Sequence, residues 1–135
     1  MANEIIKIPW RITREFITNN RRYTFVYSTN VFGGSIFGQA SQAANEPNCY
    51  GVPVRFRFCR SNLNSYFSDD GFEIITKTLI DTAIAVVPRD KPIIVFHKIG
   101  EGDSGLKWRA PKTFAYLRAK LKEIEYPHIQ WDYYA

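Results

Sequence analysis

Hydrophobic residues are grouped along the chain in short runs that predict β-strands. Tyr23–Tyr27 is a β-branched and aromatic run after a polar turn, which is typical of a buried strand. Pro92–Phe96 is continuously apolar, as in a strand covered on both faces. Val54–Phe58 alternates strictly, so we expect a half-buried strand with its phenylalanines in the core and with Arg55 and Arg57 facing solvent.

Apolar positions elsewhere recur at the spacing of α-helices. They predict one helix over Asp69–Val86, capped by Ser68 or Asp69, and another that opens at Pro111. The small-residue stretch 35–44 indicates a third helix with Ser35 as its N-cap, and Arg11–Ile17 favours a short helix, with a strand as the alternative. The buried stripes are expected to be Phe72, Ile75, Leu79, Ala83 and Val86 in the first helix, and Phe114, Leu117, Leu121 and Ile124 in the second.

The order of these elements predicts a single α/β domain. The chain contains no internal repeat, low-complexity run or linker, so one domain over residues 1–135 is expected. Residues 126–135 are expected to form a C-terminal aromatic tail or an edge strand. Alternation of strands with helices is typical of a layered α/β fold.

Composition limits the classes of function. A chain of 135 residues can bury a core without disulfides or metals, and it has no run of the roughly 20 apolar residues that cross a membrane. Two cysteines and no export signal predict a cytoplasmic protein with free thiols. His97 and His128 lie far from the cysteines and from each other, with no ligand spacing, so no metal site is expected. No cofactor is expected either. The net charge of +5 favours anionic partners without choosing among them.

Two glycine clusters, at Gly33–Gly38 and Gly100–Gly105, follow two of the predicted strands and precede helices. The first amides of a helix have no partner within the helix, and glycine lets the backbone approach a ligand closely. Such junctions bind phosphate groups, and in open α/β sheets they meet outside the carboxyl ends of the strands. The alternative is that both clusters are turns, with Gly38 allowing a helix to pack closely on the sheet.

The segment Ser28–Ala40 resembles the first ligand loop of macro domains, the ADP-ribose-binding family, in which a strand ending in asparagine is followed by glycines and a small-residue helix. The order of further short motifs is similar to a group of uncharacterised macro-like phage and bacterial proteins. The resemblance covers roughly residues 11–122 and is carried by Gly38-Gln39-Ala40, Glu46-Pro47-Asn48, Gly51-Val52-Pro53, Tyr66–Asp69, Ile99–Leu106 and Ala110-Pro111.

This resemblance implies a macro-domain-like three-layer fold, with a mixed central sheet flanked by helices, that binds ADP-ribose or a related phosphate-bearing nucleotide. It implies that Asn30 contacts the distal ribose. The two loops and the resemblance together predict the ligand-binding residues Asn30, Gly33, Gly34, Ser35, Gly38, Gln39, Gly100, Gly102, Ser104 and Gly105. In a phage setting, such a module would counter or modulate host functions.

Departures from the family favour binding over catalysis. The positions where hydrolytic members carry acidic side chains are Thr29 and Phe37 here, and a phenyl ring can neither orient water nor accept a proton. One alternative is therefore a degenerate macro-like scaffold that binds a host protein, for which the aromatic tail Trp131–Tyr134 offers a surface. The other is an ADP-ribosyl hydrolase that uses other residues.

The candidate catalytic groups for a hydrolase are His97, Asp69 and Asp103. Each has a simpler structural role: a histidine at a strand end is usually structural, and Asp69 at a helix start is usually a cap. Asp103 would repel a phosphate unless it turned to a ribose hydroxyl. Glu46, beside Pro47 in a turn, is expected to be solvated.

Arg55–Arg60, where basic and aromatic residues interleave, suggests single-stranded nucleic acid as a rival partner. Strict alternation would put the rings and the arginines on opposite faces of the strand, so the rings could not stack on bases beside the arginines. Nucleic-acid binding is therefore the less favoured interpretation.

Overall fold

The fold is known from a computed structural model, which describes residues 4–31, 38–57, 65–102 and 104–134. Its strands are β1 (Ile6–Pro9), β2 (Thr24–Asn30), β3 (Cys49–Arg55), β4 (Ile93–Val95) and β5 (Ile129–Asp132). Its helices are α1 (Arg14–Thr18), α2 (Gly38–Ala43), α3 (Thr76–Ala85), α4 (Leu106–Arg109) and α5 (Pro111–Ile124). The expected α/β class is confirmed.

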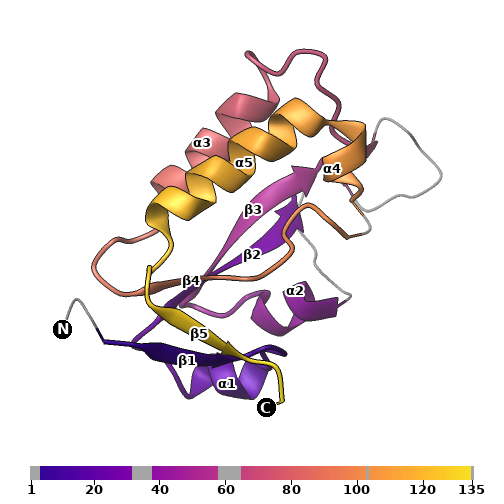
Figure 1. Cartoon of the computed structure of the whole chain (residues 1–135). Coiled ribbons are helices and arrows are strands. Elements are labelled where there is room, and N and C mark those ends of the chain that lie inside the picture. The colour runs from indigo at the N-terminus through magenta and orange to yellow at the C-terminus, as the bar shows by residue number, and fades with distance from the viewer. Residues whose placement is uncertain (1–3, 32–37, 58–64, 103, 135) are drawn as a thin grey trace.

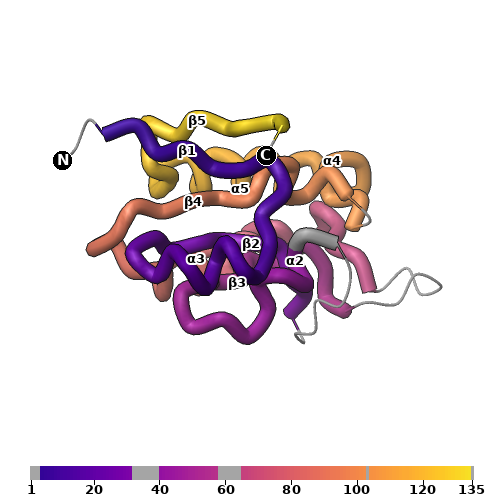
Figure 2. The backbone as a smooth tube through the Cα atoms, turned by 90° about the horizontal axis from the view of Figure 1, so that it is seen from below, coloured from indigo at the N-terminus to yellow at the C-terminus, as the bar shows by residue number. Residues whose placement is uncertain are grey.

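The described strands form two small parallel sheets in place of one mixed sheet. β2 lies between β3 and β4 in the first, and β1 pairs with β5 in the second. Helices α3 and α5 lie on one side of the three-stranded sheet, whereas α1, α2 and the β1–β5 pair lie on the other (Figure 1). The view from below shows β5 and β1 running beside β4 (Figure 2).

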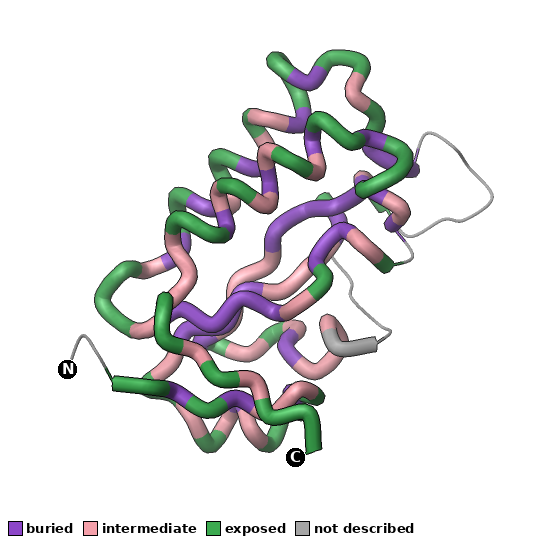
Figure 3. The backbone as a smooth tube through the Cα atoms, in the orientation of Figure 1, coloured by how far each residue is buried: buried purple, intermediate pink, exposed green. Residues whose placement is uncertain are grey.

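Buried residues follow the three-stranded sheet and recur along α3 and α5 (Figure 3). The largest fully buried side chains include Phe25, Ile94 and Leu117, which come from the middle strand, an outer strand and a covering helix. This single cluster of apolar side chains connects both sheets to the helices. Its formation supplies most of the driving force for folding.

The sequence predicted β2, β4 and α5 well, because each has one strong pattern. β2 and β4 contain the runs Thr24–Tyr27 and Ile93–Val95, and α5 begins at Pro111 with Leu117 and Leu121 buried. The short helix before β2 is also confirmed. Of the predicted helix 35–44, residues 38–43 are helical, whereas its proposed N-cap Ser35 lies outside the described residues.

The strand predicted over Val54–Phe58 lies nearer the N-terminus than expected. The strand covers Cys49–Arg55 and is buried from Val52 to Arg55 without alternation, so Arg55 is 7% exposed and does not face solvent as expected. Phe56, just beyond the strand, packs edge-on against Phe67 with ring centroids 4.8 Å apart. Phe58 and Arg60 of the rival nucleic-acid motif lie outside the described residues.

The prediction for α3 was wrong in its start and in its buried face. The helix begins at Thr76 after a series of turns that contains Gly71 at φ +74°, and it buries Thr76, Ile80 and Ile84. Ile75 and Val86 of the predicted stripe are exposed. The helix carries two adjacent apolar stripes, and the one that contacts the sheet is the one containing Ile80.

The aromatic tail forms an edge strand in part. β5 pairs in parallel with β1, which places Trp131 opposite Ile8. Tyr133 and Tyr134 beyond it are exposed. No helix among the described residues has the length and apolar content needed to cross a membrane.

Candidate functional site

The three parallel strands β2, β3 and β4 all end at the same edge of their sheet, which we call the carboxyl edge. Asn30 and Arg55 are the last residues of β2 and β3, and the two are in register across a bulge. β4 pairs with β2 in the same direction, so the loop after Val95 emerges at this edge too. The arrowheads of β2 and β3 lie near α4 in Figure 1. Ligands of open α/β sheets bind at such an edge.

The first glycine loop is described only at its two ends. Asn30 is buried at the end of β2, as a residue lining a site at this edge would be. Gly38 and Gln39 belong to the first turn of α2. Gly33, Gly34, Ser35 and Phe37 lie outside the described residues.

The glycines of the second loop have different structural roles. Gly100 is buried and has φ +87°, and a Cβ there would lie 2.8 Å from the ring of Phe114. Gly105 has φ +61° and precedes α4 as its N-cap residue. Gly102 has open space where a Cβ would be. Gly102 is therefore the glycine of this loop that leaves room for a ligand.

Several amides of the second loop already have partners. Glu101 N donates to Lys98 O at 3.0 Å, Gly105 N to Gly102 O at 3.0 Å, and Lys107 N to Gly100 O at 3.1 Å. These N–H groups can bind a phosphate only if the loop first rearranges. The loop thus supplies fewer free donors than its glycine content suggests, and other positive groups must hold an anion. Asp103 lies outside the described residues, and Ser104 is buried.

Two arginines supply positive charge at the carboxyl edge, and a tyrosine ring lies beside both of them. The Arg109 guanidinium lies 3.8 Å from the ring centroid of Tyr66, and that of Arg55 lies 5.7 Å from it. The backbone of Tyr66 forms an isolated antiparallel β-bridge with Arg55, the last residue of β3. We call these three residues the arginine–tyrosine stack. A guanidinium that stays exposed, as Arg109 does, can bind phosphate or carboxylate through two parallel hydrogen bonds.

The arginine–tyrosine stack was not predicted from the sequence. Arg109 lies four residues beyond Gly105, in a helix of only four residues that has no strong periodicity. Tyr66 was part of a motif in the resemblance but had no assigned role. The available signal was the position of Arg109 just after a glycine loop.

His97 is held in an aromatic cluster next to β4. Its ring stacks on Trp10 with centroids 3.6 Å apart and planes 8° from parallel, and Trp131 meets it edge-on at 5.4 Å. Its Nε2 is 2.8 Å from the carbonyl oxygen of Trp10. These contacts give His97 the structural role that was the simpler expectation, because they join β4 to the chain segments around β1 and β5.

Asp69 is a cap, but of a different helix from the one expected. Its carboxylate accepts hydrogen bonds from the backbone amides of Lys112 and Thr113, both at 2.9 Å, at the start of α5. The hydroxyl of Thr113 also donates to Asp69 and lies 3.0 Å from that of Thr76 at the start of α3. Partial burial acts to raise the pKa of the Asp69 carboxyl, but these hydrogen bonds and the Lys112 charge lower it below its usual value.

The Asp69→Asn variant should lose about 1 kcal/mol of unfolding free energy at neutral pH, because a neutral amide cannot accept both backbone bonds or interact with the helix dipole. A carboxyl whose pKa is lowered by folding stabilises the fold above its unfolded pKa of about 3.9, and this contribution disappears as pH falls through the lower folded pKa. Urea unfolding at several pH values should show the two proteins converging in acid. Asp70→Asn, at an exposed neighbour, should change little. A difference from wild type that stays constant down to low pH would contradict the assignment.

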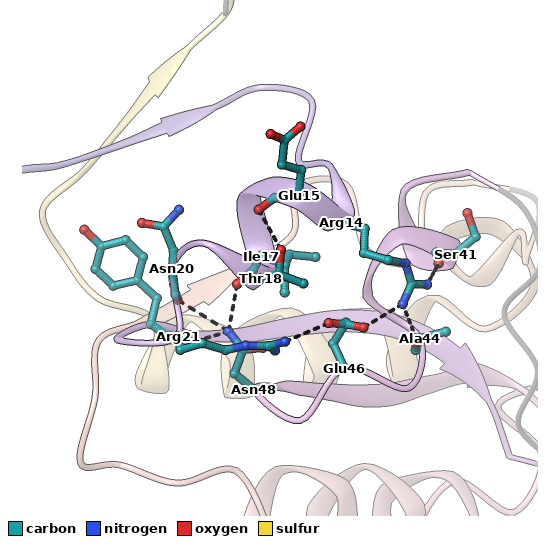
Figure 4. A network of polar contacts seen from close by, with 11 residues as sticks. Arg14, Glu15, Ile17, Thr18, Asn20, Arg21, Ser41, Ala44, Glu46 and Asn48 are labelled. Carbon is teal, nitrogen blue, oxygen red and sulfur yellow. Dashed lines mark hydrogen bonds and ion pairs between the residues drawn. The ribbon is translucent and has the colours of Figure 1, made fainter.

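Glu46 and Asn48 form a second polar network at the opposite, amino-terminal edge of the sheet (Figure 4). Arg14 contacts Glu46 at 2.7 Å and Arg21 contacts it at 3.1 Å, and the side chain of Glu46 is only 13% exposed. The expectation that Glu46 is solvated was therefore wrong. Arg14 also donates to the carbonyls of Ser41 and Ala44, so it ties the end of α2 to α1.

Cys49, at the start of β3, has a free thiol that is poorly suited to nucleophilic chemistry. Burial and the charge of Glu46 raise its pKa to about 12, against the lowering effect of Arg21 and Arg14. The thiolate is the reactive form of cysteine, and it is scarce at neutral pH for such a group. Among the described residues, no three histidine, cysteine or acidic side chains come together as metal ligands.

Comparison with known proteins gives one match. A model of a family of unknown function, DUF7831, matches residues 8–120, from β1 to the last turns of α5. No curated protein and no solved structure matches the chain. The chain belongs to the DUF7831 family.

Proposed function

We propose that the carboxyl edge binds ADP-ribose or a related phosphate-bearing nucleotide. The observation that carries this proposal is the convergence, at the ends of three parallel strands, of Asn30, the second glycine loop and the arginine–tyrosine stack. The net charge of +5 favours such a ligand. As part of this proposal, the fold is related to that of macro domains, in which helices lie on both sides of the sheet.

Within this proposal, the polar groups divide between the phosphates and the sugar. Arg109 contacts the phosphates, because its guanidinium is exposed beside the second loop and needs no rearrangement to bind an oxyanion. Gly102 leaves room for the ligand to approach the backbone. Asn30 faces the distal ribose, as the resemblance implies.

The described contacts support binding without turnover. Asp69 is occupied in capping α5, and His97 is fixed between Trp10 and Trp131. None of the described contacts joins these two candidate catalytic groups. A hydrolase would need an acid or base near the ligand that is free to exchange a proton.

The proposal predicts that the purified protein binds ADP-ribose and that Arg109→Gln weakens this binding about tenfold or more, because a charge-assisted hydrogen bond is lost. Arg22→Gln is the matched control, since Arg22 also lies over a tyrosine ring, that of Tyr23, but in the turn before the amino end of β2. Calorimetry with ADP-ribose, AMP and ribose 5-phosphate measures both effects. Equal loss in the two variants would contradict the assignment of Arg109.

The absence of binding by any of these compounds at millimolar concentration would refute the nucleotide proposal. A specific observation would then favour a scaffold that binds a host protein: Tyr133 and Tyr134 are exposed beyond β5, and Tyr134 is 100% exposed. In that case, a host protein captured from lysate by the whole chain should be lost when residues 133–135 are removed.

A further inference from the structure

A pocket opens between β4 and the latter half of α5, and none of its lining residues is among those proposed to bind the nucleotide. Its volume is about 400 Å³, within the range of roughly 300–1,000 Å³ that is usual for small-molecule sites. The pocket is lined by Val95, Arg118, Ala119, Leu121, Lys122 and Glu125. All six are described residues. The pocket is therefore large enough for a small ligand, and its two basic side chains and one acidic side chain make it polar.

The guanidinium of Arg118 contains a buried donor that lacks a partner. Its Nη1 is inaccessible to solvent and has no hydrogen-bond acceptor among the described residues. Nearly all buried polar groups in proteins are hydrogen-bonded, because an unsatisfied one costs about 1–3 kcal/mol or more. Because Nη1 is shielded from solvent, the guanidinium must turn slightly towards the pocket before an acceptor there can bind this atom, and such an acceptor would remove the cost of leaving it unsatisfied. The planar fork of a guanidinium matches the two oxygens of a carboxylate.

The backbone of β4 adds polar groups at Val95. Pro92 O and Phe96 N bond to β2. The backbone N–H and C=O groups of even-numbered residues in this strand therefore point towards β2, and those of odd-numbered residues point to the opposite, outer side. On the outer side, Ile93 O accepts a bond from Tyr126 N. The N–H and C=O groups of Val95 point to that same outer side, where no described residue bonds to them.

Glu125 provides an acceptor on the other side of the pocket. None of the described side chains donates to its carboxylate, and it makes no ion pair within 4.0 Å with Arg118. Burial raises the pKa of Glu125 above its usual value, although Arg118 and Lys122 act to lower it. An acidic and a basic side chain thus line one pocket without touching, and each lacks a partner of its own.

We propose that this pocket binds a small amino or hydroxy acid, with its carboxylate on Arg118 and its ammonium or hydroxyl group on Glu125. Lys122 adds positive charge beside the carboxylate. A single molecule with an oxyanion next to a hydrogen-bond donor satisfies both protein groups at once. This site is independent of the nucleotide proposal, because none of its lining residues is proposed to bind the nucleotide.

Two-dimensional NMR of the full chain tests the proposal with alanine, lactate and propionate, which are nearly equal in size and differ in the donor. Alanine and lactate should shift the Arg118 Nε–Hε resonance in a saturable way, and propionate should bind about tenfold more weakly because it leaves Glu125 unpaired. Arg118→Gln should abolish the backbone shifts that these ligands cause near the pocket. Lys120→Gln is the matched control, since Lys120 lies on the same helix over the ring of Tyr116, outside the pocket.

The Glu125→Leu variant separates recognition of the donor from folding, because leucine has no acceptor whereas glutamine would keep one. It should bind the three probes with similar affinity if it folds with an unchanged spectrum elsewhere. The proposal is overturned if no probe causes saturable shifts at millimolar concentration, or if wild type binds propionate as tightly as alanine and lactate. It is also overturned if Arg118→Gln retains binding, or if Arg118 proves to be paired directly with Glu125 in solution.

Discussion

Replacing Asn48 with alanine should lower the free energy of unfolding by about 2–3 kcal/mol, because Asn48 is a buried polar residue that joins the start of β3 to the segment between α1 and β2. Its Nδ2 lies 3.3 Å from Ile17 O, 3.4 Å from Asn20 O and 3.2 Å from Tyr23 O. Its Oδ1 accepts a 2.6 Å bond from Arg21. Alanine would remove the side-chain donor from Tyr23 O and the acceptor from one guanidinium N–H of Arg21, in a site that is 7% exposed. Ile17 O and Asn20 O would keep the backbone amides of Asn20 and Tyr23 as donors.

Urea unfolding measures this loss, and two further variants identify its cause. Asn19→Ala removes an exposed asparagine at the end of α1 and should cost less than about 0.5 kcal/mol. Asn48→Asp keeps an acceptor for Arg21 but has no donor for the three carbonyls, so it should also destabilise the fold. An Asn48→Asp protein as stable as wild type would refute the importance of the donated bonds.

The role of Asn48 shows which features of this fold the sequence could not reveal. The motif Glu46-Pro47-Asn48 was part of the resemblance, yet its partners Arg14, Ile17 and Arg21 lie 25–32 residues away in the sequence. Periodicity is a local signal and predicts nothing about bonds over such separations. The structure assigns this motif to the architecture, at the edge of the sheet opposite the candidate ligand site.

Two errors in the predicted elements also have physical causes. β3 contains Gly51 and Pro53, residues that usually interrupt strands, and it is an outer strand of its sheet, where proline is tolerated. In α3, the stripes containing Ile75 and Ile80 are both apolar, so periodicity could not decide which one contacts the sheet. Asp69 was correctly predicted to be a cap, but its helix is α5, which lies more than 40 residues further along the chain.

The position of the candidate site was easier to predict than its chemistry. Apolar runs followed by glycines are local signals, and parallel pairing of β2 with β4 is what brings their carboxyl ends together. The pairing of Tyr66 with Arg109 depends on how β3, α4 and the segment before α3 pack. The hydrogen bonds that second-loop amides make within the loop could not be predicted from the sequence either.

The other large effect is expected at Gly100, where alanine should destabilise the fold by about 3 kcal/mol. Gly100 has φ +87°, a conformation that costs a residue with a side chain about 1–3 kcal/mol. A Cβ would also lie 2.8 Å from Phe114 Cδ1 and 3.3 Å from Leu106 Cδ2, so the packing of α4 and α5 would have to shift. This cost arises from the fold and does not require a ligand.

Gly102→Ala is the matched control in the same loop, because a Cβ there has nothing within 4 Å and the residue has no positive φ. It should unfold at nearly the same urea concentration as wild type. Thermal unfolding with ADP-ribose then separates structure from binding: Gly102→Ala should reduce the stabilisation by ligand while leaving the free protein stable. A Gly100→Ala protein as stable as wild type would contradict the conformation described for the second loop. It would also contradict the position of Arg109 at the site.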